Sequence, residues 1–338
     1  MHPFVEAIYR ELVQDVKHSK RSLEKIALRC GVGNPTQVKE LTELAIVHRA
    51  RELAQSGLSL KQRYQNIVAL YQSQVNLSYR TSQSVLLQQY STPAPISFLA
   101  SSFVQSGQPA DAAYFEPSAG NGLLTIALPE HQVTVNEIDD IRLANLRSQH
   151  FAKVCSRDAA SPFFEYRKKF DGVITNPQFG TLPATICYGR YPIKTLDHLM
   201  ALRALDCMKD SGRAAIIIGG HTDWDEKKRI KAGKNRIFFS YLYEHYHVAE
   251  VININGELYS RQGTTFDVRL ILITGRKEKP GGFAPLKTAA DTAANDFKTL
   301  LERVIPHIAE DDDKAQRLRV ARAKAIAKMR MLALLKRI

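Results

Sequence analysis

The sequence predicts an α/β fold in which helices cover a mainly parallel, twisted sheet, and helical segments flank the sheet in the chain. Two observations support this prediction. From about residue 110 to 275, short apolar runs of strand type alternate with segments of helical spacing, which is typical of βαβ units. Residues 1 to 88 contain no convincing strand, and their apolar side chains recur at helical spacing.

The expected organisation has three parts: a helical region (1–88), the α/β domain (89–278), and a linker followed by basic helices (279–338). The stretch "KPGGFAP" marks the linker, and residues 314–338 carry nine Lys or Arg and no acid. Within the helical region, "LEKIALRCGVGNPTQVKELTELA" has the rhythm of a DNA-reading helix-turn-helix. Its glycines and proline would equally separate two helices of a bundle.

Composition restricts the class of protein. A formal net charge of +13 favours a polyanionic partner, and RNA and DNA satisfy this equally. The four cysteines lack CxxC spacing, which favours a reducing compartment and no zinc site. No apolar stretch approaches the roughly 18 residues of a membrane span, and the N-terminal segment has the pattern of a surface helix. We expect a soluble, cytoplasmic protein with no metal and no membrane partner.

The first strand of the α/β part runs into "FEPSAGNGLLTIAL", a loop with Glu116, Pro117, Gly120 and Gly122. Glycines here let the backbone approach a ligand without a Cβ in the way. The Lys-Ser or Lys-Thr of a P-loop is missing, and Thr125 stands where a dinucleotide fold prefers a third glycine. The loop therefore indicates a site in which Glu116 faces a cationic ligand.

Two further acids follow the next two strands. Glu137 comes after "VTVN" and could accept both hydroxyls of a ribose, whereas Asp158 comes after "KVCS" and could accept a hydrogen bond from an adenine amino group. Either acid alone could be an ordinary helix N-cap. Acids at three successive strand ends together predict a nucleoside site.

At this point the sequence resembles a known family. Glu116 to Gly122, Glu137 and Asp158 look like the first three motifs of class I S-adenosylmethionine-dependent methyltransferases. The fourth strand ends in Asn176, Pro177, Gln178 and Phe179, which is similar to the Asn-Pro-Pro-aromatic motif of amino-methyltransferases, particularly the adenine-N6 DNA methylases that plasmids and phages carry. The resemblance covers about residues 88–275 and implies a Rossmann-like, seven-stranded methyltransferase sheet with S-adenosylmethionine as cofactor.

The resemblance also implies roles for single residues. Upstream, "QQYSTPAPISFLA" is similar to the segment that such enzymes place against the methionine end of the cofactor, which makes Tyr90 and Thr92 candidates for its carboxylate side. Ile138 would pack on the adenine of the cofactor, and Asn176 would also contact the cofactor. Locally, Thr92 is equally a helix start and Ile138 equally a core residue.

The end of the fourth strand suits the methylation of an amine. The lone pair of an adenine N6 amine is delocalised, so an enzyme gains by accepting hydrogen bonds from both N–H groups while it holds the methyl donor in line. The Asn176 side-chain oxygen and the Pro177 carbonyl are suitable acceptors, and Phe179 could stack on a flipped base. Gln178 departs from the second proline of the family, which leaves open a different acceptor or weakened activity.

The predicted function is therefore adenine-N6 methylation of DNA. The alternatives are methylation of RNA or of a protein glutamine, or a catalytically weakened DNA-binding accessory protein. Only about 60 residues follow the last strand, so target recognition must come from the helical region, from the segment 221–246, or from a partner chain or dimer. That segment combines Trp224, Phe238 and Phe239 with the basic residues Lys227, Lys228, Arg229, Lys231, Lys234 and Arg236. For Phe266 we expect ordinary packing rather than a place in a base pocket.

Overall fold

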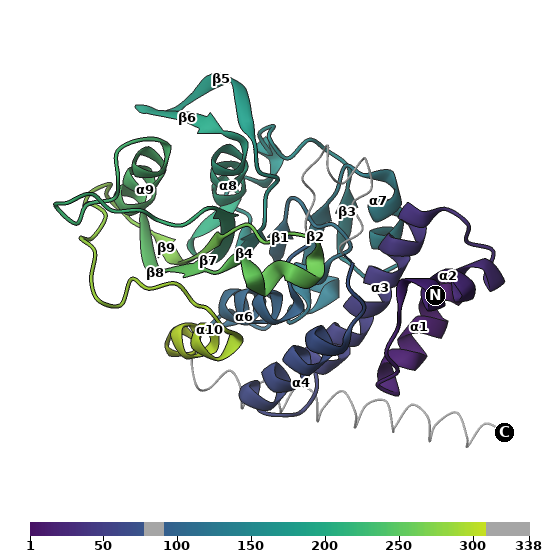
Figure 1. The fold of residues 1–338 in the computed structure, drawn as a ribbon. Coiled ribbons are helices and arrows are strands. Elements are labelled where there is room, and N and C mark those ends of the chain that lie inside the picture. Colours follow the sequence, from purple (N-terminus) through teal and green to yellow (C-terminus); the bar gives the residue numbers. More distant parts are fainter. Residues whose placement is uncertain (78–90, 309–338) are drawn as a thin grey trace.

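A computed structural model describes residues 1–77 and 91–308 (Figure 1). Its centre is a seven-stranded sheet with the order β3-β2-β1-β4-β7-β9-β8. Only β9 is antiparallel to its neighbours, which are β7 and β8. The strands are β1 (Tyr114–Glu116), β2 (Val133–Asn136), β3 (Lys153–Cys155), β4 (Phe170–Thr175), β7 (Met208–Gly219), β8 (Tyr246–Ile254) and β9 (Val268–Arg276). The predicted Rossmann-like, seven-stranded sheet is confirmed, and each strand overlaps one of the predicted runs.

The chain reverses its direction of travel across the sheet next to β1. It passes outward from β1 through β2 to β3 and then returns to β4 on the other side of β1, where Tyr114 is opposite both Val133 of β2 and Gly172 of β4. In open α/β sheets, ligands bind at the carboxyl ends of strands beside such a switch point. The topology alone therefore places a binding site between β1 and β4.

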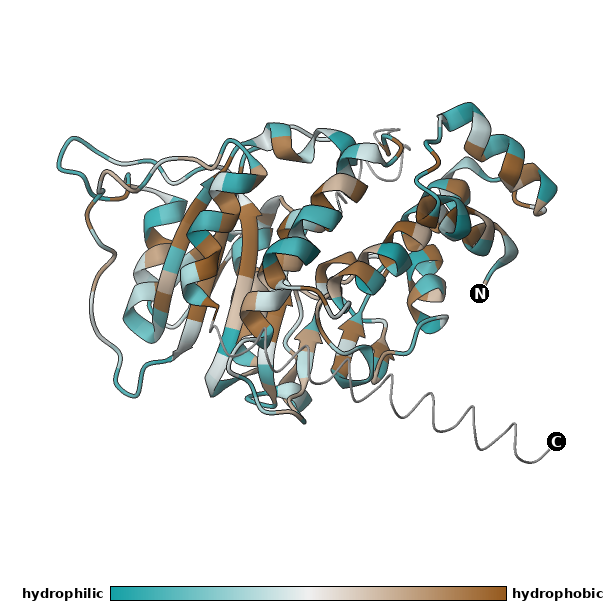
Figure 2. Ribbon diagram, turned by 90° about the horizontal axis from the view of Figure 1, so that it is seen from below, coloured by the Kyte–Doolittle hydropathy of each residue, from teal (hydrophilic) through white to brown (hydrophobic). Residues whose placement is uncertain are grey.

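Two hydrophobic cores lie on opposite faces of the sheet because consecutive side chains of a strand point to opposite sides. Along β7, Ile216 and Ile218 pack with α8 and α9, whereas Ala215 and Ile217 belong to the core that contains α6. Figure 2 shows the apolar strands between helices with mixed surfaces. The helices that follow the N-terminal region are α6 (Ala94–Gln105), α7 (Asp140–Arg147), α8 (Leu196–Asp206), α9 (Lys234–His245) and α10 (Phe297–Val304).

The N-terminal region consists of helices, as predicted: α1 (Pro3–Val13), α2 (Lys20–Arg29), α3 (Pro35–Ala54) and α4 (Leu60–Ser73). Helix α3 packs against α1, α4, α6 and α7. Every residue from Val38 to Val47 is buried, so this stretch presents no exposed face to a DNA groove, as a recognition helix must. The bundle alternative is correct for this segment, and α3 joins the N-terminal helices to the sheet.

Two segments differ from their predictions. A hairpin of β5 (Thr181–Tyr188) and β6 (Tyr191–Thr195) follows β4 and was not predicted; its tyrosines Tyr188 and Tyr191 pack on α9. The second half of segment 221–246 is α9, in which Phe238 and Phe239 are fully buried. These two rings are core positions and are not available to unstacked bases.

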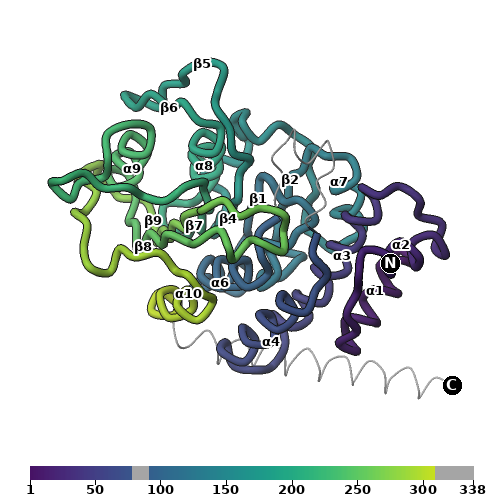
Figure 3. Tube along the Cα trace, viewed as in Figure 1, coloured from purple at the N-terminus to yellow at the C-terminus, as the bar shows by residue number. Residues whose placement is uncertain are grey.

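After β8, the segment 255–267, which contains a short helix at Gly256–Gln262, crosses the ends of β7 and β4 toward β1 (Figure 3). It brings Tyr259 and Phe266 to the switch point. No helix within residues 1–77 and 91–308 is long and apolar enough to cross a membrane. Tyr90 and the predicted basic helix at 314–338 lie outside the described residues, and the three-part division of the chain stays a prediction.

Candidate active site

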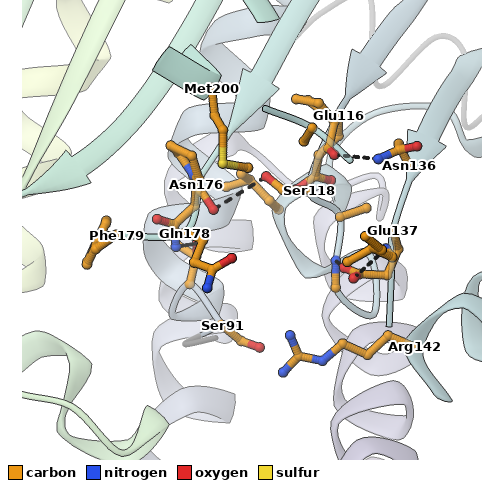
Figure 4. A pocket seen from close by; sticks show the side chains of 18 of the residues that line it. Ser91, Glu116, Ser118, Asn136, Glu137, Arg142, Asn176, Gln178, Phe179 and Met200 are labelled. Carbon is orange, nitrogen blue, oxygen red and sulfur yellow. Dashed lines mark hydrogen bonds between the residues drawn. The ribbon is translucent and has the colours of Figure 1, made fainter. Parts of the chain in front are cut away.

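The acids and the amide predicted at the strand ends line one cavity of about 250 Å³. Glu116 ends β1, Glu137 follows β2, Asp158 follows β3 and Asn176 follows β4. Figure 4 shows several of these side chains around the space that they enclose. Of the predicted site residues, the cavity is lined by Thr92, Glu116, Pro117, Gly120, Glu137, Ile138, Asp158, Asn176, Pro177 and Phe179. Their predicted roles remain predictions.

The two loop glycines serve different purposes. Gly120 has a φ of 56°, and a Cβ there would meet only Arg142 Nη1, at 4.0 Å. It therefore opens the backbone to the cavity. Gly122 does not line the cavity: its φ is 90°, and a Cβ would lie 3.0 Å from the ring of Phe151. The predicted contact of Gly122 with a cofactor stays a prediction, and in the structure this glycine allows close packing against Phe151.

Glu137 braces the loop. Its carboxylate accepts hydrogen bonds from the backbone N–H of Gly120 (2.8 Å), Ile138 (2.8 Å) and Asp139 (2.9 Å). A carboxylate offers about four acceptor positions, so roughly one remains for a ligand. Glu137 was expected to accept hydrogen bonds from both ribose hydroxyls. In this arrangement it has an acceptor position for one of them.

Glu116 is a buried acid without a hydrogen-bonding partner for its Oε2 among the described residues. It is 1% exposed. Burial raises the pKa of its carboxyl well above the ordinary value, and the charge of Glu137 adds to the rise, whereas Arg51 opposes it. A buried polar group with no partner is costly. A cationic ligand in the cavity would relieve this cost.

Asn176 is fixed at the end of β4. Its Nδ2 donates to Thr92 Oγ1 at 2.9 Å, and its backbone carbonyl accepts from Ser118 Oγ at 3.5 Å. In this arrangement the Nδ2 end of the Asn176 amide faces Thr92. The next residue, Pro177, is buried, and no described residue donates to its carbonyl. Gln178 lies beside them in the cavity (Figure 4).

Three apolar side chains leave surface open at the cavity. Ile138 is 60% exposed and Phe266 is 62% exposed, whereas Phe179 is half-buried and its ring lies 3.4 Å from where a Cβ on Gly219 would be. Such exposed apolar faces at a cavity offer stacking surfaces. The expectation of ordinary packing for Phe266 is wrong, because segment 255–267 holds it out over the site.

The cavity is acidic although the chain is basic. Four acids line it, and so do Arg142 and Arg157, but both arginines pair with acids outside the lining: Arg142 with Glu40 and Arg157 with Glu165. The lining acids are Glu43, Glu116, Glu137 and Asp158. Against a net charge of +13 for the whole chain, this local excess of negative charge favours a cation.

The sequence reading missed several residues of the site, above all Glu43 from α3, together with Ser91, Ser118, Arg142, Met200 and Tyr259. Tyr259 is buried, and burial raises the pKa of its hydroxyl. The charged residues inside the otherwise apolar stretch "QVKELTELAIV" were the available signal for Glu43. Charges on the buried side of a helix indicate a structural or functional partner.

The predicted nucleic-acid contacts lie elsewhere, because none of the six basic residues lines the cavity. Arg229 and Arg236 are both bound to Asp225, at 3.1 Å and 3.0 Å. The other four, Lys227, Lys228, Lys231 and Lys234, are exposed. Among the described residues no cluster of His, Cys, Asp and Glu could hold a metal ion.

No protein-family model matches the sequence, and a search of curated proteins finds no match. Solved structures that resemble the fold include a protein from Listeria monocytogenes described as a class I S-adenosylmethionine-dependent methyltransferase (14% identity, 90% of this chain, 99% of that chain, TM-score 0.47). Another is a protein from Vibrio vulnificus described as a modification subunit of a type I restriction enzyme (14% identity, 73% of this chain, 59% of that chain, TM-score 0.46). A third is a protein from Pyrococcus horikoshii described as an RNA methyltransferase (18% identity, 63% of this chain, 98% of that chain, TM-score 0.41). At these TM-scores we draw no functional conclusion from the likeness.

Proposed function

We propose that this chain is an S-adenosylmethionine-dependent methyltransferase that acts on the exocyclic N6 amine of adenine in DNA. The observation that carries the proposal is the acidic cavity directly beside Asn176 and Pro177. Bound there, S-adenosylmethionine would supply an electrophilic methyl group on a positively charged sulfur. The cavity suits such a ligand because it combines buried carboxylates, an open glycine and exposed apolar faces.

The residues that would hold the cofactor follow from their places in the cavity. Glu116 offers a buried carboxylate without a partner for its Oε2. Glu137 has about one acceptor position left for a ribose hydroxyl. Ile138 presents an exposed apolar face to an adenine ring, and Asp158 lies at the same edge of the sheet.

The chain would act on the acceptor amine by orientation. The side-chain oxygen of Asn176 and the carbonyl of Pro177 would accept the two N–H bonds of N6, which biases that nitrogen toward tetrahedral geometry. Phe179 and Phe266 would stack on the base. Stacking contributes about 1–3 kcal/mol per base and offsets part of the cost of flipping.

The net charge favours a nucleic acid but not DNA over RNA, because both carry phosphates. DNA is favoured by the resemblance to adenine-N6 methylases. The accessory-protein alternative gains no support from the cavity, because a buried acid such as Glu116 lowers stability unless a ligand uses it. Target recognition through a second chain stays part of the proposal. The buried middle of α3 and the buried Phe238 and Phe239 are not available for base contacts, whereas the rest of the helical region and the exposed lysines of segment 221–246 remain candidates.

Transfer of a tritiated methyl group tests the proposal. Incubation with labelled S-adenosylmethionine and unmethylated DNA should place label on adenine, and RNA and total protein should remain unlabelled in parallel reactions. In Asn176→Ala, the rate should fall about 100- to 1000-fold, as when one preorganised hydrogen-bonding group is lost from an active site. The exposed Asn295→Ala should leave the rate unchanged. Label on RNA or protein would favour the alternatives, and full activity of Asn176→Ala would refute the assigned role of the amide.

A further inference from the structure

The cavity has an acid that comes from outside the α/β part of the chain. Glu43 lies in the middle of α3, is 2% exposed, and lines the same cavity as Glu116 and Asn176. Its Oε1 accepts a hydrogen bond of 2.6 Å from Ser91 Oγ, and the carboxylate makes no other hydrogen bond or ion pair with a described residue. The N-terminal helices therefore form part of the wall of the site.

Arg142, which acts electrostatically on Glu43, makes its ion pair with Glu40. Arg142 Nε lies 2.9 Å from Glu40 Oε2, and its Nη2 lies 3.3 Å from Glu40 Oε1. Asn121 Nδ2 also donates to Glu40, at 2.7 Å. Arg142 and the buried Lys39 are the cations that act on Glu40 and Glu43, but the ion pair of Arg142 is with Glu40. The carboxylate on the cavity side, Glu43, therefore has no ion pair with a described residue.

The electrostatics agree with this geometry. Burial raises the pKa of the Glu43 carboxyl, and the charge of Glu40 adds to the rise. The opposing groups are Arg142, the Ser91 hydroxyl and Lys39, and they do not overcome burial. Neither Arg142 nor Lys39 makes an ion pair with Glu43, so the carboxyl has no direct cationic partner among the described residues that face it.

Glu43 is also connected to the catalytic end of the cavity. Its partner Ser91 precedes Thr92, and Thr92 accepts the hydrogen bond from Asn176. Figure 4 shows Ser91 and Arg142 at one end of the cavity and Met200 at the other, with Asn176 toward Met200. A ligand whose reactive centre lies at Asn176 can therefore extend along this wall to Glu43.

We propose that Glu43 is a cofactor-specificity residue that binds the α-ammonium group of the methionine part of S-adenosylmethionine. The inference rests on the proposed function. It adds that the N-terminal helical region forms part of the cofactor site, since the carboxylate reaches it from α3. Glu116 and Glu43 then oppose a ligand that carries two positive charges, on its sulfur and on its amine.

Truncated ligands test this assignment by isothermal titration calorimetry. The probes are S-adenosylhomocysteine, its decarboxylated form, which keeps the amine, and 5′-methylthioadenosine, which lacks the whole amino-acid part. In Glu43→Gln, which keeps an acceptor for Ser91, affinity for the two amine-bearing probes should fall about tenfold or more. Affinity for 5′-methylthioadenosine should stay within about twofold, because this probe has no amine and therefore makes no contact with Glu43 that the substitution could remove.

Controls separate the possible failures. Glu52→Gln, on the same helix with a side chain that is 51% exposed, should bind all three probes like the unchanged protein. Glu43→Asp keeps the charge and should retain part of the discrimination. Equal losses for all probes, or no loss for any, would overturn the role of Glu43 while the proposed function stands. If the unchanged protein does not bind S-adenosylhomocysteine, the proposed function fails, and the inference fails with it.

Discussion

The buried charges around the cavity and the exposed charges of residues 226–236 are two ways in which one chain uses charge. Glu40 and Arg142 are about 6% exposed in their side chains and pair across 102 residues of sequence. Arg229 is 54% exposed and pairs with Asp225 four residues away. A buried charge must find a partner, so its position carries information about structure and ligands. An exposed charge is solvated wherever it lies and carries much less information.

The largest difference is expected in stability. Glu40→Gln leaves Arg142 buried without its ion pair, although Glu43 and Glu137 still act on its charge, and breaking a buried pair in this way costs about 3–5 kcal/mol. Because Glu43 offsets part of the unpaired charge, we expect a loss near about 3 kcal/mol in urea denaturation. Arg229→Gln should lose less than about 1 kcal/mol. Similar losses for the two variants would remove the distinction between the two regions.

What could be predicted from the sequence follows the same division. The seven strands and the polar residues at their ends were predictable because each depends on a local pattern: an apolar run, then Glu116, Glu137, Asp158 or Asn176. Parallel strands bring such ends to one edge whatever else the chain does. The fold class and most of the cavity wall therefore required no knowledge of distant contacts.

The parts that were missed depend on long-range contacts. Glu43 becomes a cavity residue only because α3 packs on the sheet, and the pairing of Glu40 with Arg142 has no local signature. Phe266 is exposed because segment 255–267 crosses the strand ends, whereas spacing alone favoured packing. The hairpin β5–β6 was missed although Leu182, Ala184, Ile186 and Tyr188 alternate along β5. No residue of β5 is fully buried, and Pro183 within the run argues against a strand when only the sequence is known.

Protonation provides the second difference between the regions. Because burial and Glu137 raise the pKa of Glu116 in the folded chain, and Arg51 only opposes this, the carboxyl favours folding when protonated. Its contribution to stability is present below the ordinary glutamate pKa and is lost as pH rises through the raised value. A bound cation favours the ionised form of the Glu116 carboxyl. Ligand binding should therefore release a proton at pH values between the ordinary glutamate pKa and the raised one.

Calorimetry of S-adenosylmethionine in phosphate and in Tris would detect this proton, because the positively charged sulfur of this ligand is the cation that Glu116 would face. The apparent enthalpy should differ between the two buffers in proportion to their ionisation enthalpies, and affinity should rise with pH by up to about tenfold per unit for one linked proton. Glu116→Gln should reduce the difference and should also weaken binding. An enthalpy that is equal in both buffers for the unchanged protein would show that binding releases no net proton, and the assignment of Glu116 as the acid that ionises on binding would then fail.

The smallest effect is expected from the exposed lysines. Replacement of Lys227, Lys228, Lys231 and Lys234 by Gln removes charges that no described acid within 4.0 Å neutralises, whereas Arg229 and Arg236 stay bound to Asp225 and preserve the loop. If these lysines contact phosphates, DNA affinity at low salt should fall several-fold, and the slope of log affinity against log salt should decrease by about 0.9 for each lost contact. Methyl transfer at saturating DNA should stay within about twofold, because none of the four lines the cavity.

Lys298→Gln, at a site whose side chain is 84% exposed, is the matched control for a single charge and should leave the slope unchanged. An unchanged slope in the fourfold variant would make residues 226–236 an ordinary solvated face, and the search for the DNA-binding surface would then turn to the hairpin β5–β6 or to a partner chain.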